Sequence, residues 1–218
     1  MKLLIKYPCR LRLKNLTNLL QYLILNIKNK NTEIIISIDV DDKHIYNKES
    51  LKHLKPLLDN NKIKLFVSKS ESKVDAYNRD LNEIQWTHLL CISDYVEFTT
   101  NGFDNIIIEE CLRYASYPIK FQSSNQFYNQ YHNLFIVPYK FYLSKKYIFN
   151  PCLKSNYHYE LLTKELKSFY GKIHYSDIVI HKYVHSKWGY DKIDNQTLIH
   201  INNWRKDLIS LENENSII

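Results

Sequence analysis

Three of the apolar, strand-like runs in this chain end in side chains that can do chemistry. Arg10 follows the first run, Asp39 lies at the end of another, and Asp94 follows a run further along. Open α/β sheets bind ligands outside the carboxyl ends of their strands, so three such ends on one sheet edge would line a single crevice. Carboxylates there could hold a cation or a ribose, and a guanidinium could hold a phosphate. The pattern predicts a ligand site at this edge.

Further polar residues stand close to these strand ends. Glu97, three residues after Asp94, offers a second oxygen ligand of the kind that hard divalent cations prefer. Lys73 opens an expected helix and could reach a phosphate, and Asn78 on the same helix could bond a ribose or base. A strand-end acid also serves as a turn former, and a polar helix start is often simply solvated. Spacing alone leaves both alternatives open.

The elements that must position these residues alternate between strand and helix in the first half of the chain. Runs typical of buried strands occupy residues 2–8, 33–40, 62–68 and 88–93, and helical spacing of apolar residues occupies 14–28, 48–55, 73–84 and 103–114. Pro56 is expected to end the second of these helices. Such alternation predicts a largely parallel sheet with right-handed crossovers.

The second half of the chain breaks this rhythm. We expect short strands at 119–122 and 134–137, helices at 139–147 and 157–169, an extended segment at 173–183, and a helical tail from Gln196 to about Asn213. No internal repeat or low-complexity linker divides the 218 residues, so a single domain is expected.

Composition narrows the class of protein. A hydrophobic content of 44% and a charged content of 24% are those of an ordinary soluble globular protein. With only 3 glycines and neither a P-loop nor a G-x-G-x-x-G sequence, glycine-rich phosphate loops are essentially excluded. Any nucleotide must therefore be held by side chains and strand ends.

Charge and cysteines bear on partners and compartment. The net charge of +7 permits a nucleic acid or an anionic membrane surface as partner, but the lysines are scattered rather than clustered. The first apolar stretch is too short for a signal peptide or a membrane span. The four cysteines lack C-x-x-C spacing and are expected to be reduced thiols of a cytoplasmic protein.

Four blocks of sequence carry a resemblance to a known family. Ile5 to Arg12 is similar to a strand followed by Pro-Thr-Arg-Ser-Arg, and Ile36 to Asp42 to a strand that ends in an acid. Ser70 to Asp80 is similar to a Ser-x-x-Lys-x-x-Ala-x-Asn-x-Asp block. Ser93-Asp94-Tyr95 stands where the family has Ser-Asp-Asp, and Gly102-Phe103-Asp104 follows. Together the blocks resemble a compact nucleotide-sugar glycosyltransferase of the GT-A fold, family 2-like, as found in phages and large viruses.

The resemblance implies roles for individual residues. The implied nucleotide-binding residues are Pro8, Arg10, Asp39, Lys73, Asn78, Ser93 and Asp94. The implied ligands of a divalent cation, Mn²⁺ or Mg²⁺, are Asp94, Glu97 and His181. Glu160 stands where the family carries its catalytic base, and His185 is a second choice for the histidine.

Departures from the family pattern gather at the implied metal site. Tyr95 replaces the second Asp of Ser-Asp-Asp, and Tyr183 replaces the second His of a His-x-His-Pro segment. The Asp of the Asp-x-Glu that carries the base is missing, which leaves Glu160 alone. Three alternatives follow: a reduced ligand set suffices, cation binding is weak or absent, or catalysis has been lost.

The resemblance implies a single α/β domain of GT-A type with a mixed central sheet. About residues 1–115 would form a Rossmann-like nucleotide-binding half, and about 116–218 the acceptor side with the C-terminal helix. The implied activity is transfer of a hexose from a nucleotide diphosphate sugar, most simply a UDP-sugar, to a hydroxyl of a glycan or protein. The alternatives are hydroxymethylated bases of viral DNA as acceptor, in which case the protein would work in the host cytoplasm, and a degenerate binding module. No membrane span is expected.

Overall fold

The computed structural model describes residues 1–93, 96–114, 117–124, 134–153 and 158–183. Its strands are β1 (Leu3–Cys9), β2 (Thr32–Asp39), β3 (Ile63–Ser68), β4 (His88–Cys91), β5 (Val96–Phe98), β6 (Ile119–Ser123), β7 (Leu134–Pro138) and β8 (His174–Tyr183). Its helices are α1 (Leu13–Asn26), α2 (Lys48–Leu58), α3 (Lys73–Asn78), α4 (Phe103–Arg113), α5 (Tyr139–Lys145) and α6 (His158–Tyr170).

All eight strands join one mixed sheet in the order β3-β2-β1-β4-β7-β6-β8-β5. Strands β1 to β4 are mutually parallel, β7 pairs antiparallel with both β4 and β6, and β6 and β8 are parallel. Because β7 alone reverses direction between β4 and β6, the strands β6 and β8 run the same way as β1. The expected parallel first half and mixed sheet are confirmed, in a single-domain α/β fold.

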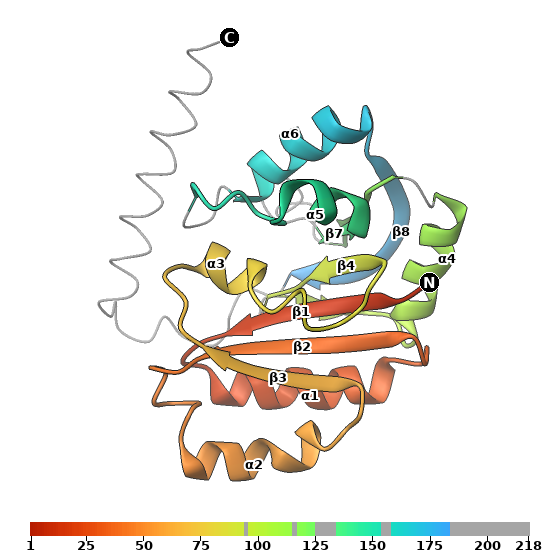
Figure 1. Ribbon diagram of the computed structural model, residues 1–218. Coiled ribbons are helices and arrows are strands. Elements are labelled where there is room, and N and C mark those ends of the chain that lie inside the picture. Colours follow the sequence, from red (N-terminus) through yellow and green to blue (C-terminus); the bar gives the residue numbers. More distant parts are fainter. Residues whose placement is uncertain (94–95, 115–116, 125–133, 154–157, 184–218) are drawn as a thin grey trace.

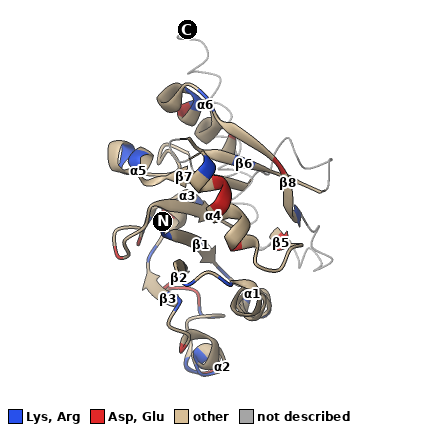
Figure 2. Cartoon of the chain, turned by 90° about the vertical axis from the view of Figure 1, so that its right-hand side faces the viewer, with Lys and Arg blue, Asp and Glu red and all other residues tan. Residues whose placement is uncertain are grey.

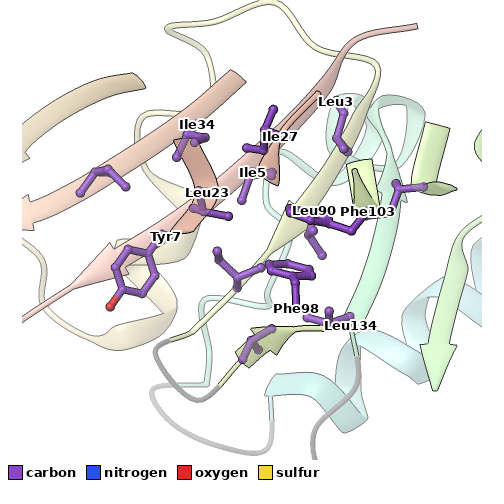
Figure 3. Close-up of a cluster of buried hydrophobic side chains, with 14 of the residues drawn as sticks. Leu3, Ile5, Tyr7, Leu23, Ile27, Ile34, Leu90, Phe98, Phe103 and Leu134 are labelled. Atoms are coloured by element: carbon purple, nitrogen blue, oxygen red, sulfur yellow. The ribbon is translucent and has the colours of Figure 1, made fainter. Parts of the chain in front are cut away.

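Two apolar clusters cover the two faces of the sheet. Helices α1, α2 and α4 pack on one face, and α3, α5 and α6 on the other (Figure 1). Strand β1 is buried on both sides. Leu3, Ile5 and Tyr7 lie in the first cluster (Figure 3), and Leu4 belongs to the second. The alternation of side chains along a strand puts Lys6 on the same face as Leu4, the face of α3.

The largest differences from the sequence expectation are the ends of two helices and one additional strand. Helix α2 continues through Pro56 to Leu58, because Leu57 and Leu58 pack on the core and hold the last turn. Helix α3 ends at Asn78 rather than near 84, and Asp80 adopts a left-handed backbone with φ 65°. The three-residue strand β5 was not expected, since so short a segment carries almost no periodicity.

The expected helix at 196–213 lies outside the described residues. Within the described ranges, no helix combines the length and the apolar character that crossing a bilayer requires.

Candidate functional site

The polar residues that end β1 and β2 meet at the carboxyl edge of the parallel strands. Asp39 is the last residue of β2, Arg10 follows β1 directly, and Arg79 follows the last residue of α3. This convergence follows from the topology, because parallel neighbours bring their carboxyl ends to one edge. Arg79 joins the group only because α3 stops at Asn78 and the chain turns towards the sheet.

Asp39 lies between two guanidinium groups. Arg10 Nη1 donates a hydrogen bond to Asp39 Oδ2 at 2.7 Å. Arg79 Nη1 lies 3.2 Å from Asp39 Oδ1, an ion-pair distance without hydrogen-bond geometry, and Arg79 Nη2 donates to the carbonyl of Ile38 at 2.7 Å. Only 6% of Asp39 is exposed. The two cations offset the cost of burying this carboxylate.

Asp42 connects the loop after β1, which carries Arg10, with the loop after β2. Its Oδ2 accepts a hydrogen bond from Leu11 N at 2.7 Å, and its Oδ1 accepts one from His44 N at 3.1 Å. Leu11 has a left-handed backbone with φ 63°, a conformation that costs a bulky residue energy and that the buried Asp42 helps to hold. The position of Arg10 is therefore set by a loop tied to the end of β2.

A second charged layer lies under the first. Lys6 is fully buried in β1, and its Nζ donates to Ser37 Oγ and, at 2.7 Å, to the carbonyl of Arg79. Ser37 Oγ in turn donates to Asp80 Oδ2, which lies 3.4 Å from Lys6 Nζ and 3.4 Å from Arg79 Nε. Burial lowers the pKa of Lys6 to about 8, and Asp80 opposes part of that effect. The two layers share Arg79.

Some of the expected nucleotide-binding residues lie at the carboxyl edge of the sheet, and one of them, Asn78, has a structural role. Pro8 is half-buried in β1, opposite Ser37 of β2, and Lys73 is half-buried at the start of α3. Asn78 is bound to the second half of the chain: its Nδ2 donates to Phe149 O at 2.6 Å, and its Oδ1 accepts from Ile148 N and Phe149 N. Its amide therefore holds α3 in place.

The three expected metal ligands do not converge in the part of the chain that the structure describes. Asp94 lies outside the described residues, and Ser93 is half-buried just after β4. Glu97 pairs across the strands with Lys182, and their side chains form an ion pair at 3.1 Å. His181 pairs with Phe98, so it points to the opposite face and is fully buried. Glu97 and His181 therefore cannot both ligate one cation in this arrangement.

Burial also lowers the pKa of His181 to about 4, which keeps the imidazole neutral. Among the described residues, no group of three or more His, Cys, Asp or Glu side chains is placed to hold a metal ion. The described residues alone therefore do not assemble the donor set that the resemblance implies.

The expected catalytic base Glu160 is exposed in the first turn of α6. Its neighbour Tyr159 packs edge-on against Phe149, with ring centroids 5.2 Å apart. Helix α6 packs on the same face of the sheet as α3, the face to which Lys6 points. Glu160 therefore lies on that side of the sheet.

Lys6, Ser37, Arg79 and Asp80 are part of the site and were not among the expected site residues, although Asp80 ends one of the blocks that carry the resemblance. The sequence offers one signal for Lys6. It lies inside the apolar run 3–9, and a lysine in a buried strand almost always has a polar or charged partner. Its partners are 31 and 74 residues away, and sequence spacing gives no access to them.

No protein-family model matches this sequence, and no curated protein does either. Solved structures do resemble the fold. Residues 1–349 of S. aureus TarS superpose with a TM-score of 0.66 at 13% identity, covering 84% of this chain and 60% of that one. The same TarS fragment in complex with UDP-GlcNAc gives a TM-score of 0.67 at 13% identity, covering 87% and 60%.

A mannosyltransferase, PcManGT from Pyrobaculum calidifontis in complex with GDP-Man and Mn²⁺, gives a TM-score of 0.63 at 11% identity, covering 86% of this chain and 58% of that one. The chain thus spans about three fifths of these structures. At such identities the likeness establishes the fold, and it confirms the expected GT-A architecture.

Proposed function

We propose that this protein is a glycosyltransferase that moves a hexose from a nucleotide diphosphate sugar, most simply a UDP-sugar, to a hydroxyl acceptor. The observation that carries the proposal is the buried Asp39 between Arg10 and Arg79, at the carboxyl edge of a GT-A sheet. TarS with UDP-GlcNAc and PcManGT with GDP-Man, which share this fold, support a nucleotide-sugar donor.

The proposed donor contacts follow from the chemistry of this edge. The side chain of Asp39 is 8% exposed at this edge of the sheet, and we propose that its carboxylate accepts a hydrogen bond from the imide N–H of uracil. Arg10 donates from Nη1 to Asp39 and from Nη2 to Asp41, and its side chain is one third exposed, so the exposed part of the guanidinium is proposed to face the diphosphate. Pro8, Lys73 and Ser93 are proposed to border the same nucleotide.

The proposed chemistry uses the protein's own acid and base groups. Glu160 would remove the proton from the acceptor hydroxyl as it attacks the anomeric carbon, and the diphosphate would leave as the glycosidic bond breaks. Asp94 remains the proposed ligand of a divalent cation, which when bound would neutralise the departing diphosphate.

A glycan or protein hydroxyl is the proposed acceptor. The net charge of +7 leaves hydroxymethylated DNA as an alternative. On the side shown in Figure 2, however, Lys and Arg positions are spread over α2, α4, α5 and α6 with acidic positions among them. DNA binding through phosphate contacts would have to weaken steeply with added salt.

A second candidate is a degenerate module that binds a nucleotide sugar without transferring it. Tyr95, where the family has an acid, is the observation that favours this candidate. Its fold and nucleotide site would be those described, and only the chemistry would be missing.

Calorimetry with UDP, GDP and UDP-GlcNAc, with and without Mn²⁺, tests the donor site. We expect micromolar to millimolar binding of UDP that weakens in Asp39→Asn. Transfer of radiolabelled sugar to glycan, protein and hydroxymethylated duplex DNA then separates the acceptors. Binding without transfer or donor hydrolysis would support the degenerate module, and absence of nucleotide binding under every condition would refute the proposal.

A further inference from the structure

A buried lysine lies one layer below the proposed nucleotide site, in a position where an apolar residue would be expected. Lys6 is central in β1, with Ile35 of β2 and Cys91 of β4 as its strand neighbours, and it is fully buried. Burying an ammonium group is costly, and replacing a buried ion pair by apolar residues is often neutral or stabilising. Stability alone therefore does not account for a lysine here.

The contacts of Lys6 fix the turn that follows α3. Its Nζ donates to the carbonyl of Arg79 at 2.7 Å and lies 3.4 Å from Asp80 Oδ2, and Ser37 Oγ bonds both Lys6 and Asp80. Asp80 is held in a left-handed conformation, φ 65°, which a non-glycine residue adopts only when its surroundings stabilise it. The lysine thus anchors one backbone carbonyl and one carboxylate of this turn.

The same turn aims the side chain of Arg79 at the proposed base contact. Arg79 Nη2 donates to Ile38 O at 2.7 Å, and Arg79 Nη1 lies 3.2 Å from Asp39 Oδ1. Arg79 is only about a tenth exposed, so its guanidinium has little room to find Asp39 from a shifted backbone. A continuous path of contacts therefore runs from Lys6 through Asp80 and Arg79 to Asp39.

We propose that Lys6 is a positioning residue for the nucleotide, which acts through Asp80 and Arg79 to hold Asp39 in the orientation that binds the base. This inference rests on the proposed function, because it assigns the lysine to that same site. Lys6 touches no part of the nucleotide in this scheme. Removing its charge should weaken nucleotide binding while the sheet still forms.

The charge of Lys6 also makes a pH-dependent readout available. Its pKa is lowered to about 8, so Lys6 loses its charge as the pH rises through that value. The charged groups facing it are Asp80 and Arg79. The thiol of Cys91 and the phenol of Tyr159, on β4 and α6, have pKa values raised by burial and stay neutral in this range.

The test is the affinity for UDP and for GDP, measured by calorimetry at pH 7 and pH 9.5. The variants are Lys6→Met and the matched control Lys120→Met. Lys120 is a half-buried lysine on β6 that lies over the rings of Phe135 and Tyr175, away from Lys6 and its partners. Titration of the ligand itself is common to all variants and cancels in the comparison.

We expect Lys6→Met to bind UDP at least about tenfold more weakly than the wild type at pH 7. The deficit should shrink at pH 9.5, where the wild-type lysine is itself mostly uncharged, and the preference for UDP over GDP should fall in parallel. Lys120→Met should match the wild type at both pH values. Unchanged UDP affinity in Lys6→Met, or a deficit equal at both pH values, would overturn the inference.

If Lys6→Met does not fold, Ser37→Ala and Asp80→Asn carry the same test, because each removes one partner of the lysine while leaving its stem in place. Wild-type affinity for UDP in both would overturn the inference. Failure of the wild type to bind any nucleoside diphosphate is a different result: it refutes the proposed function itself, and the inference with it.

Discussion

Asp39 is the side chain on which the candidate site converges. Both of its oxygens face a guanidinium, at 2.7 Å from Arg10 and 3.2 Å from Arg79, and the side chain is almost completely enclosed. Such a carboxylate is worth little to stability when compared with an apolar residue, but removing one partner of the set leaves the others buried and uncompensated. Stability alone therefore does not explain the buried carboxylate, whereas a role in ligand binding does.

Replacing Asp39 by Asn should lower nucleotide affinity and stability together. We expect UDP to bind at least tenfold more weakly and the free energy of unfolding to fall by about 2 kcal/mol, because two cations lose one of their counter-charges while Arg10 keeps Asp41 and Arg79 keeps Asp80. Calorimetry and urea unfolding measure the two effects. In the control Asp59→Asn, which breaks an exposed i,i+4 pair with Lys55, stability should change by no more than about 0.5 kcal/mol. UDP affinity equal to that of the wild type in Asp39→Asn would place the base elsewhere.

Replacing Asp94 by Asn tests the proposed cation. If Asp94 holds a cation that stabilises the leaving diphosphate, the variant should lose about 3–4 kcal/mol of transition-state stabilisation, a fall in kcat of two to three orders of magnitude. Chelation with EDTA should depress the wild type similarly and leave the variant unchanged. Turnover near the wild-type rate in the variant would show that the cation is bound elsewhere or is not needed.

Gly102-Phe103-Asp104, one of the blocks that resemble the family, connects two helices of the fold. Gly102 has φ 68° and donates from its N–H to Asn26 O at 2.9 Å, which docks the start of α4 on the end of α1. Asp104, fully buried, accepts from Lys28 N at 3.1 Å and Asn29 N at 2.8 Å, and from Thr32 Oγ1 at 2.9 Å. These bonds fasten α4 to the connection between α1 and β2.

Asp104→Ala should therefore affect stability and leave nucleotide binding intact. Two backbone N–H groups and the buried hydroxyl of Thr32 would lose their acceptor, and we expect the free energy of unfolding to fall by about 3 kcal/mol. Urea unfolding measures the loss, and UDP calorimetry at a temperature where the variant is folded measures the site. Glu109→Ala, at an exposed position of the same helix, is the control and should change stability by under about 0.5 kcal/mol. A selective loss of UDP binding would mean that the block belongs to the site.

At the scale of the whole molecule, buried ionisable groups tie stability to pH. His88 begins β4, between Leu3 of β1 and Pro138 of β7, and is only 8% exposed. Burial, with a smaller contribution from the positive N-terminus, lowers the pKa of His88 to about 4. An unfolded histidine has a pKa of about 6.5, so between these values the unfolded state binds the proton and the folded state does not.

The contribution of His88 to the free energy of unfolding is therefore fully present above about pH 6.5. It is lost as the pH falls towards 4, which lowers the free energy of unfolding by about 3 kcal/mol at most. His88→Gln should flatten this acid limb of urea-unfolding free energies measured at pH 7, 5.5 and 4.5. His53→Gln, at an exposed position on α2, should keep the wild-type slope. An identical slope in His88→Gln and the wild type would show that other groups carry the acid sensitivity.

The alternation of strands and helices and the polar strand ends can be predicted from the sequence, because the periods of 2.0 and 3.6 residues are local properties. The runs that became β1, β2 and α1 are bounded within a residue or two of their final ends. Arg10 and Asp39 could be expected to approach each other for the same reason, since adjacent parallel strands end at one edge.

The sheet faces to which these residues point, and the distant partners that they contact, are set by the folded structure. Glu97 and His181 were expected to share a cation, yet the antiparallel register of β5 and β8 turns them to opposite faces. Arg79 reaches Asp39 because α3 ends early, and Lys6 finds Ser37 and Asp80 across 31 and 74 residues. Register and long-range pairing depend on how whole elements pack, and no local pattern in the sequence encodes them.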